Sequence, residues 1–222
     1  MSYGLHWEWR GFGAIDPDAR RQIQHLPPIG GSTTVTDRYV WYPGLAINVK
    51  VREWTGGESL KLKRLLRRDE VLDVELWEER EDEDYPLPLT TEDFRSILRA
   101  LDWGHLPATP PADREALEDL LVHASPGGRL ITVTKRRQIY AAVVDQVPVR
   151  IEVADIAEPE VLTSVGIEDQ LGLRGDSPPE LQARGRDAVS AVRDELELGL
   201  ESRSYLDALG FWARGARLVP ET

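Results

Sequence analysis

The chain has 222 residues, of which 41% are hydrophobic and 30% are charged, a composition typical of a globular protein. Its formal net charge of -12 at pH 7 disfavours nucleic acid and anionic membranes as partners. The absence of cysteine excludes disulfides, thiolate catalysis and cysteine-bound zinc. No apolar run is long enough to cross a bilayer and the N-terminus lacks a signal-peptide pattern, so we expect a soluble, cytoplasmic protein.

The first part of the chain is predicted to be rich in strands. A strand is expected over residues 4–14, and Asp16-Pro17-Asp18 predicts the start of a helix that ends near Leu26. The prolines and glycines over 27–31 predict an interruption after that helix. Further strands are expected over 33–42, 45–54, 58–66 and 69–80, with Gly56-Gly57 as a hairpin turn.

The second part of the chain is predicted to begin and end with helices. Helices over 90–101 and 111–124 form an expected helical insertion of about 90–124. Strands follow over 129–137, 139–145, 147–156 and 161–168, and C-terminal helices are expected over 178–198 and 202–213, within about 178–213. We therefore expect one α+β domain over 1–222 with a mostly antiparallel sheet, which can close into a barrel or tunnel.

Several predicted strands alternate apolar and charged residues, so each has one apolar and one charged face. These segments are 6–10, 48–52, 60–63, 73–76 and 149–153. Some of them are basic and others are acidic, which indicates a shared site for a polyanion and a metal ion. No dinucleotide-binding fingerprint, P-loop or GxSxG motif occurs.

Basic residues lie two apart on three predicted strands: Lys50 and Arg52, Lys61 and Lys63, and Lys135 and Arg137. Pairing of the first two strands would bring four cations onto one sheet surface, at a cost of up to about 1 kcal/mol for each opposed pair. A bound triphosphate would remove this cost, since arginine suits bidentate phosphate contacts and lysine suits point-charge contacts. The alternative is a solvated basic face.

Acidic residues on other strands form a second set: Glu8, Glu75, Glu152 and Glu168. Carboxylates beside a phosphate repel it unless a hard cation such as Mg2+ or Mn2+ lies between them. Such an ion would polarise a phosphoryl oxygen and help to orient a water molecule for attack. The alternative is a network of ion pairs with the basic strands. His6 shares a face with Glu8 and is a further candidate for metal binding or acid–base chemistry.

The order of these segments resembles the CYTH superfamily, the triphosphate tunnel metalloenzymes. His6-x-Glu8-x-Arg10 stands where that family has an N-terminal ExExK motif. The segments 37–43, 48–52 and 60–63 are similar to the strands that follow it in the family, and 134–137 is similar to its K-x-R strand. The segments 149–155 and 165–168 resemble its paired acidic strands, and 196–209 resembles its closing pair of helices.

The resemblance implies an antiparallel eight-stranded tunnel-like barrel flanked by helices, with Mg2+ or Mn2+ as cofactor. It implies a metal-dependent phosphohydrolase acting on a small-molecule triphosphate or polyphosphate, whether inorganic, nucleoside or thiamine triphosphate. The implied catalytic residues are Glu8, Arg10 and Lys63, and the implied metal ligands are Glu8, Glu75, Glu152 and Glu168. The implied phosphate-binding residues are Lys50, Arg52, Lys61, Lys63, Lys135 and Arg137.

The chain departs from the family pattern at three positions. His6 replaces the first motif glutamate, Arg10 replaces the motif lysine, and Gly166 stands where a second late glutamate is expected. Fewer carboxylates should weaken metal binding, which affects catalysis more than anion binding. A tunnel that binds a phosphorylated ligand without turnover, as a sensor or partner module, is therefore the alternative function, and a class IV-type adenylyl cyclase is a third.

Overall fold

The computed structural model describes residues 3–80, 85–103, 106 and 109–219. Within these residues eight strands form one antiparallel barrel in the order β1-β5-β4-β3-β2-β7-β8-β9, which the pairing of β9 with β1 closes. The strands are β1 (Tyr3–Gly13), β2 (Pro28–Trp41), β3 (Ile47–Trp54), β4 (Gly57–Asp69), β5 (Val74–Arg80), β7 (Arg129–Val144), β8 (Val147–Glu158) and β9 (Leu162–Asp169). Two short strands, β6 (Tyr85–Pro86) and β10 (Glu201–Ser202), pair with β4 and β1. The predicted α+β fold with an eight-stranded antiparallel barrel is confirmed.

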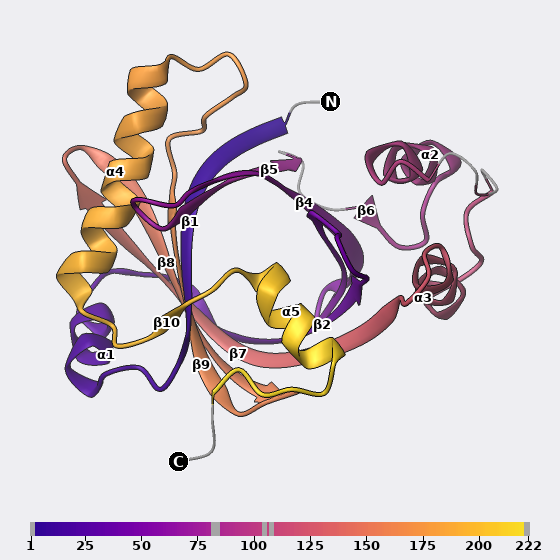
Figure 1. Ribbon diagram of the computed structural model, residues 1–222, viewed down its shortest axis with the longest axis horizontal. Helices are drawn as coiled ribbons and strands as arrows, with labels where there is room; N and C mark the ends of the chain where they lie inside the picture. Colours follow the sequence, from indigo (N-terminus) through magenta and orange to yellow (C-terminus); the bar gives the residue numbers. More distant parts are fainter. Residues whose placement is uncertain (1–2, 81–84, 104–105, 107–108, 220–222) are drawn as a thin grey trace.

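The helices lie around and across this barrel (Figure 1). They are α1 (Pro17–Gln24), α2 (Thr91–Ala100), α3 (Arg114–His123), α4 (Pro179–Leu196) and α5 (Tyr205–Ala213). The bounds predicted from the sequence agree with these to within three residues. Side chains of Asp16, Thr90, Asp113 and Ser204 cap four of the helices by accepting backbone N–H bonds. No helix among the described residues is long and apolar enough to span a membrane.

Two of the predicted interruptions are wrong. The expected strands over 129–137 and 139–145 are one strand, β7, because Gln138 pairs with Val153 of β8 and no turn intervenes. Gly30 and Gly31 lie inside β2, where the register with β7 shifts between Ile29 and Thr33. Gly30 has a φ of +68°, so glycine is suited to this irregularity in a continuing strand.

The apolar faces of the strands form two outer cores and one inner core. Trp7 and Trp9 belong to the core beneath α1 and α4, and Leu60 belongs to the core beneath α2 and α3. On the inner face, Phe12 and its neighbours pack against α5. The charged faces of the strands line the rest of the barrel interior, and the candidate site lies there.

Candidate functional site

The charged side chains of the strands face a cavity of about 160 Å3 inside the barrel. Of the described residues that line it, eight are lysine or arginine and four are glutamate. The lining includes the predicted residues Glu8, Arg10, Lys50, Arg52, Lys61, Lys63, Lys135, Arg137, Glu152 and Glu168, and it does not include Glu75. It also includes Glu79 and Arg150, which the sequence did not single out. Basic side chains thus outnumber acidic ones in this cavity, inside a chain of net charge -12, which favours an anionic ligand over a cationic one.

Lys50 lies among other cations of the cavity. It lies directly opposite Lys61 in the pairing of β3 with β4, as the hairpin prediction implied. Burial, together with the charges of Arg52, Lys135 and Lys61, lowers the pKa of Lys50 well below its usual value, although Asp37 opposes the shift. An anion beside Lys50 would therefore reduce the repulsion between Lys50 and these neighbouring cations.

Asp37 is the shared acidic partner of Arg52, Lys50 and Lys135, which form the basic cluster of the cavity. The sequence did not identify it as a site residue. Its wholly buried carboxylate accepts two hydrogen bonds from Arg52, at 2.6 and 2.8 Å. The Nζ atoms of Lys50 and Lys135 lie 3.7 and 3.6 Å from the same carboxylate. Burial alone would raise the pKa of Asp37, but these three cations hold it well below its usual range.

Glu152 lies among cations rather than beside the other predicted metal ligands. It accepts a hydrogen bond of 3.1 Å from Nη1 of Arg137, and Nζ of Lys135 lies 3.6 Å away. Nη1 of Arg10 lies 3.4 Å from its Oε1 atom. Burial opposes ionisation of Glu152, but the surrounding cations, with Lys135 first, hold its pKa well below its usual value. At this residue the structure has the ion-pair network that the sequence left as an alternative.

Arg10 connects the two buried glutamates of the cavity. Its Nε donates to Oε1 of Glu8 at 2.8 Å, while Nη1 contacts Glu152 and donates to Oγ of Ser164 at 3.0 Å. Its guanidinium carbon also lies 5.1 Å from the ring centroid of Tyr205. These contacts fix the guanidinium, so Arg10 orients both carboxylates.

Glu8 stands at the centre of the acidic part of the site. It is directly opposite Glu75 on β5 and Glu168 on β9 in the strand pairing. It is 5% exposed and bonds to both Lys63 and Arg10. Burial opposes its ionisation, but these cations, with Lys63 first, hold its pKa well below its usual value. Glu8 is therefore a carboxylate at neutral pH.

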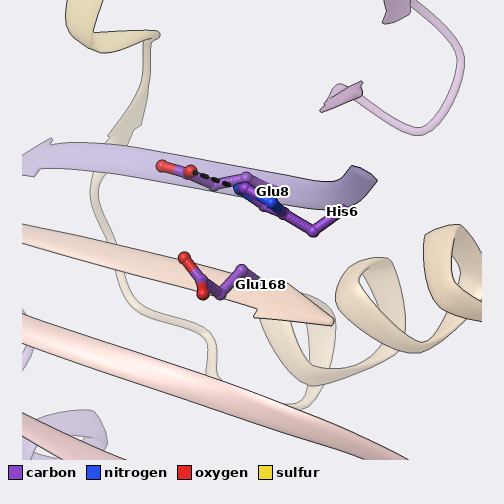
Figure 2. A group of neighbouring side chains, drawn as sticks. All are labelled: His6, Glu8 and Glu168. Atoms are coloured by element: carbon purple, nitrogen blue, oxygen red, sulfur yellow. Dashed lines mark ion pairs between the residues drawn. The ribbon is translucent and has the colours of Figure 1, made fainter. Parts of the chain in front are cut away.

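The described residues bring one group of possible metal ligands together: His6, Glu8 and Glu168 (Figure 2). A ring nitrogen of His6 and one carboxylate oxygen of each glutamate all lie within 4.8 Å of one another. Glu168 also accepts from Nη2 of Arg150 at 2.6 Å. Of the four predicted metal-binding glutamates, the structure thus groups Glu8 with Glu168.

Glu75 is not one of these three possible metal ligands, and its carboxylate contacts other residues. Its carboxylate contacts Nε of Arg68 at 2.9 Å and accepts from Nε1 of Trp77 at 3.1 Å. Burial raises the pKa of Glu75 to about 7. Arg68 opposes this shift, and repulsion from Glu8 and Asp207 adds to it. It therefore titrates near neutral pH, unlike Glu8.

Two tyrosines close the cavity at the end covered by α5. The ring of Tyr205, the first residue of α5, stacks on that of Tyr39 with centroids 5.1 Å apart. Nζ of Lys135 lies 3.4 Å from the Tyr205 hydroxyl and 5.1 Å from the ring centroid. Neither tyrosine was predicted as a site residue, although Tyr39 and Tyr205 both lie in segments that carried the family resemblance.

No protein-family model matches the chain, and no curated protein does. Solved structures do match. The PH1012 protein of Pyrococcus horikoshii is 17% identical with a TM-score of 0.51, over 90% of this chain and 98% of that one. A conserved hypothetical protein of Pyrococcus furiosus is 17% identical with a TM-score of 0.50, over the same shares. A Bacillus halodurans protein provisionally named an adenylate cyclase is 12% identical with a TM-score of 0.48, over 96% of this chain and all of that one. At these identities the likeness concerns the fold alone.

Proposed function

We propose that this chain, whose closed antiparallel barrel is CYTH-like, is a divalent-metal-dependent triphosphatase that holds its substrate inside the barrel. The observation that carries the proposal is that basic side chains outnumber acidic ones by eight to four among the described residues that line the cavity. These cations come from β1, β3, β4, β7 and β8, so they surround the cavity on several sides. A chain of phosphates offers anionic oxygens to several of these strands at once, whereas a single carboxylate does not.

Two groups in the cavity favour a ligand with phosphate oxygens. Nε of Arg137 is buried and has no hydrogen-bond partner, although Nη1 is bonded to Glu152. A buried donor without an acceptor is unfavourable, and a phosphate oxygen would satisfy it. Burial and the neighbouring cations depress the pKa of Lys50, and the same anion would favour its charged form.

A divalent cation fits the acidic end of the cavity. Glu8 and Glu168 supply carboxylate oxygens within 4.8 Å of each other, on strands held in register by the closed barrel. When bound there, such an ion polarises a phosphoryl oxygen and lowers the pKa of a coordinated water. Arg10 would keep Glu8 oriented, and Lys63, which already contacts Glu8, would stabilise negative charge that develops on the phosphoryl group. Attack by water on the terminal phosphorus would release inorganic phosphate.

Phosphate release from tripolyphosphate, ATP and thiamine triphosphate, each with Mg2+ or Mn2+, tests the proposal. We expect turnover of at least one of them, and a loss of about a hundredfold in the variant Glu8→Gln, since even supporting groups of metal sites are worth 10–100-fold. Glu70→Gln changes an exposed glutamate in the same way and should retain full activity. No phosphate release with any of the three substrates would overturn hydrolysis.

Binding without turnover is the second candidate, and one observation favours it. Arg10 spans Glu8 and Glu152, so a fixed cation already neutralises part of the acidic set. In that case tripolyphosphate would raise the melting temperature while no phosphate appears. Cyclic AMP among the products from ATP would instead identify a cyclase.

A further inference from the structure

His6 carries a buried nitrogen that has no hydrogen-bond partner among the described residues, and its ion-pair contact is with Glu8 (Figure 2). Its side chain is 13% exposed, and its Nε2 atom is buried and makes no hydrogen bond. The nearest acidic group is Oε2 of Glu8 at 3.8 Å, beyond hydrogen-bond distance. A neutral imidazole has one nitrogen with a lone pair, which accepts a hydrogen bond or binds a metal ion. Nε2 of His6 is therefore a candidate ligand atom on the side of Glu8.

We propose that His6, Glu8 and Glu168 bind one metal ion through a nitrogen and two oxygens, and that His6 makes the site prefer Zn2+ over Mn2+ and Mn2+ over Mg2+. The proposal deepens the proposed function, on whose metal requirement it rests. Mg2+ prefers oxygen ligands in near-octahedral geometry, whereas an imidazole nitrogen favours later transition ions, and Zn2+ above all suits mixed histidine and carboxylate sites. The residue that breaks the family's motif is thus a ligand of a different kind.

The strands hold the three donors in place. His6 and Glu8 are two apart on β1 and so project to the same face, and Glu168 lies directly opposite Glu8 on β9 (Figure 2). Two donors each 2.0–2.2 Å from one ion can be at most about 4.4 Å apart. The separations, all within 4.8 Å, come close to this limit, so small side-chain rotations complete the site.

The contacts of Glu168 leave a defined oxygen for the ion. Nη2 of Arg150 and Nε2 of Gln170 both contact Oε1 of Glu168, at 2.6 and 2.8 Å. A metal ion would therefore take Oε2.

Lys63 competes with a metal ion for Glu8. Its Nζ contacts Oε2 of Glu8, the same oxygen that faces His6, and lies 5.0 Å from the ring centroid of Trp77. An ammonium group and a divalent cation repel each other at one oxygen, so Lys63 would leave Glu8 when an ion binds and would be available to a bound phosphate. Metal and triphosphate should therefore each bind more tightly in the presence of the other.

Calorimetric titration of the chelator-treated protein with Zn2+, Mn2+ and Mg2+ tests the proposal without any measurement of turnover. We expect affinities in that order for the wild type. His6→Gln should weaken Zn2+ binding by about tenfold to a hundredfold, and should weaken Mg2+ binding less. His6→Glu should bring the three affinities closer together. His25→Ala, which removes an exposed histidine next to α1, is the matched control and should change none of them.

A spectroscopic measurement identifies the nitrogen ligand. The Mn2+-loaded wild type should show 14N coupling in pulsed electron paramagnetic resonance, and His6→Gln should not. Unchanged Zn2+ affinity in His6→Gln, or Mg2+ bound as tightly as Zn2+ by the wild type, would overturn the proposal. Circular dichroism shows whether the variants fold. If His6→Gln does not fold, Glu168→Gln is measured instead, and it should lose Zn2+ affinity to the same extent.

Failure of the proposed function gives a different result. The rise in melting temperature on addition of tripolyphosphate in a chelator tests anion binding without metal, and it should survive in His6→Gln. If that rise is absent while Zn2+ binding depends on His6, the triphosphatase proposal fails and the metal site stands. If the rise is present while Zn2+ affinity is the same in the wild type and in His6→Gln, the metal-site proposal is wrong and the triphosphatase proposal is not affected.

Discussion

The guanidinium of Arg10 occupies the space that a side chain at position 166 would fill. A β-carbon on Gly166 would lie 2.4 Å from Nη2 of Arg10, and the two residues face each other directly on β1 and β9. Each departs from the CYTH pattern, in which a lysine and a glutamate are expected. Arg10 in this position therefore leaves no room for a side chain at position 166 unless the guanidinium moves.

Gly166→Ala should therefore act through Arg10. The guanidinium is fixed by Glu8 and Ser164, so it cannot move without losing those hydrogen bonds. We expect a loss of about 1–3 kcal/mol in the free energy of unfolding in urea. Arg10→Lys vacates the space, so the double variant should be more stable than the sum of the two single changes predicts, by roughly 1 kcal/mol. Strict additivity would show that the two positions are independent.

Asp37 should be essential for the stability of the cation cluster when no anion is bound. Asp37→Asn removes the carboxylate that pairs with Arg52 and lies beside Lys50. It leaves Glu152 as the remaining carboxylate beside Lys135. We expect a loss of about 3–5 kcal/mol in the free energy of unfolding, of which added tripolyphosphate restores a part. Asp176→Asn, at an exposed position, is the control. An equal loss with and without tripolyphosphate would contradict the placement of the anion beside this cluster.

Anion binding should take up a proton at Lys50. Burial and nearby cations lower the pKa of Lys50 in the free protein, and a bound anion raises it again. Because the free protein loses this proton at a lower pH than the complex does, affinity for tripolyphosphate should fall as pH rises above the pKa of Lys50 in the free protein. Titration calorimetry in buffers of different ionisation enthalpy measures the proton uptake. Lys50→Arg, whose charge does not titrate, should abolish most of this uptake, and uptake that persists in the variant would assign it to another group.

The sequence alone was sufficient to predict which side chains share one face of a strand. It was not sufficient to predict which side chains of different strands meet inside the barrel. Alternation with period two places Lys50, Arg52, Lys135 and Arg137 on one face, and the closed barrel turns that face inward. Which side chains meet inside depends on register between strands far apart in the chain. For that reason Asp37 was missed, and Glu152 could not be separated from Glu8 and Glu168 before the pairing of β8 with β9 was known.

Glu75 should make the protein less stable as pH rises through neutrality. Its pKa of about 7 in the folded chain lies above the usual value of 4.5, so the folded state binds a proton that the unfolded state has lost between these pH values. The stability linked to this proton is full below about pH 4.5 and is lost as pH approaches and passes 7. Glu75→Gln keeps an acceptor for Trp77 but cannot ionise. The variant should match the wild type near pH 4 and exceed it by roughly 1–3 kcal/mol at pH 8, as measured by urea unfolding across this range. A variant less stable than the wild type at pH 8 would mean that the ion pair with Arg68 outweighs the cost of burying the charge.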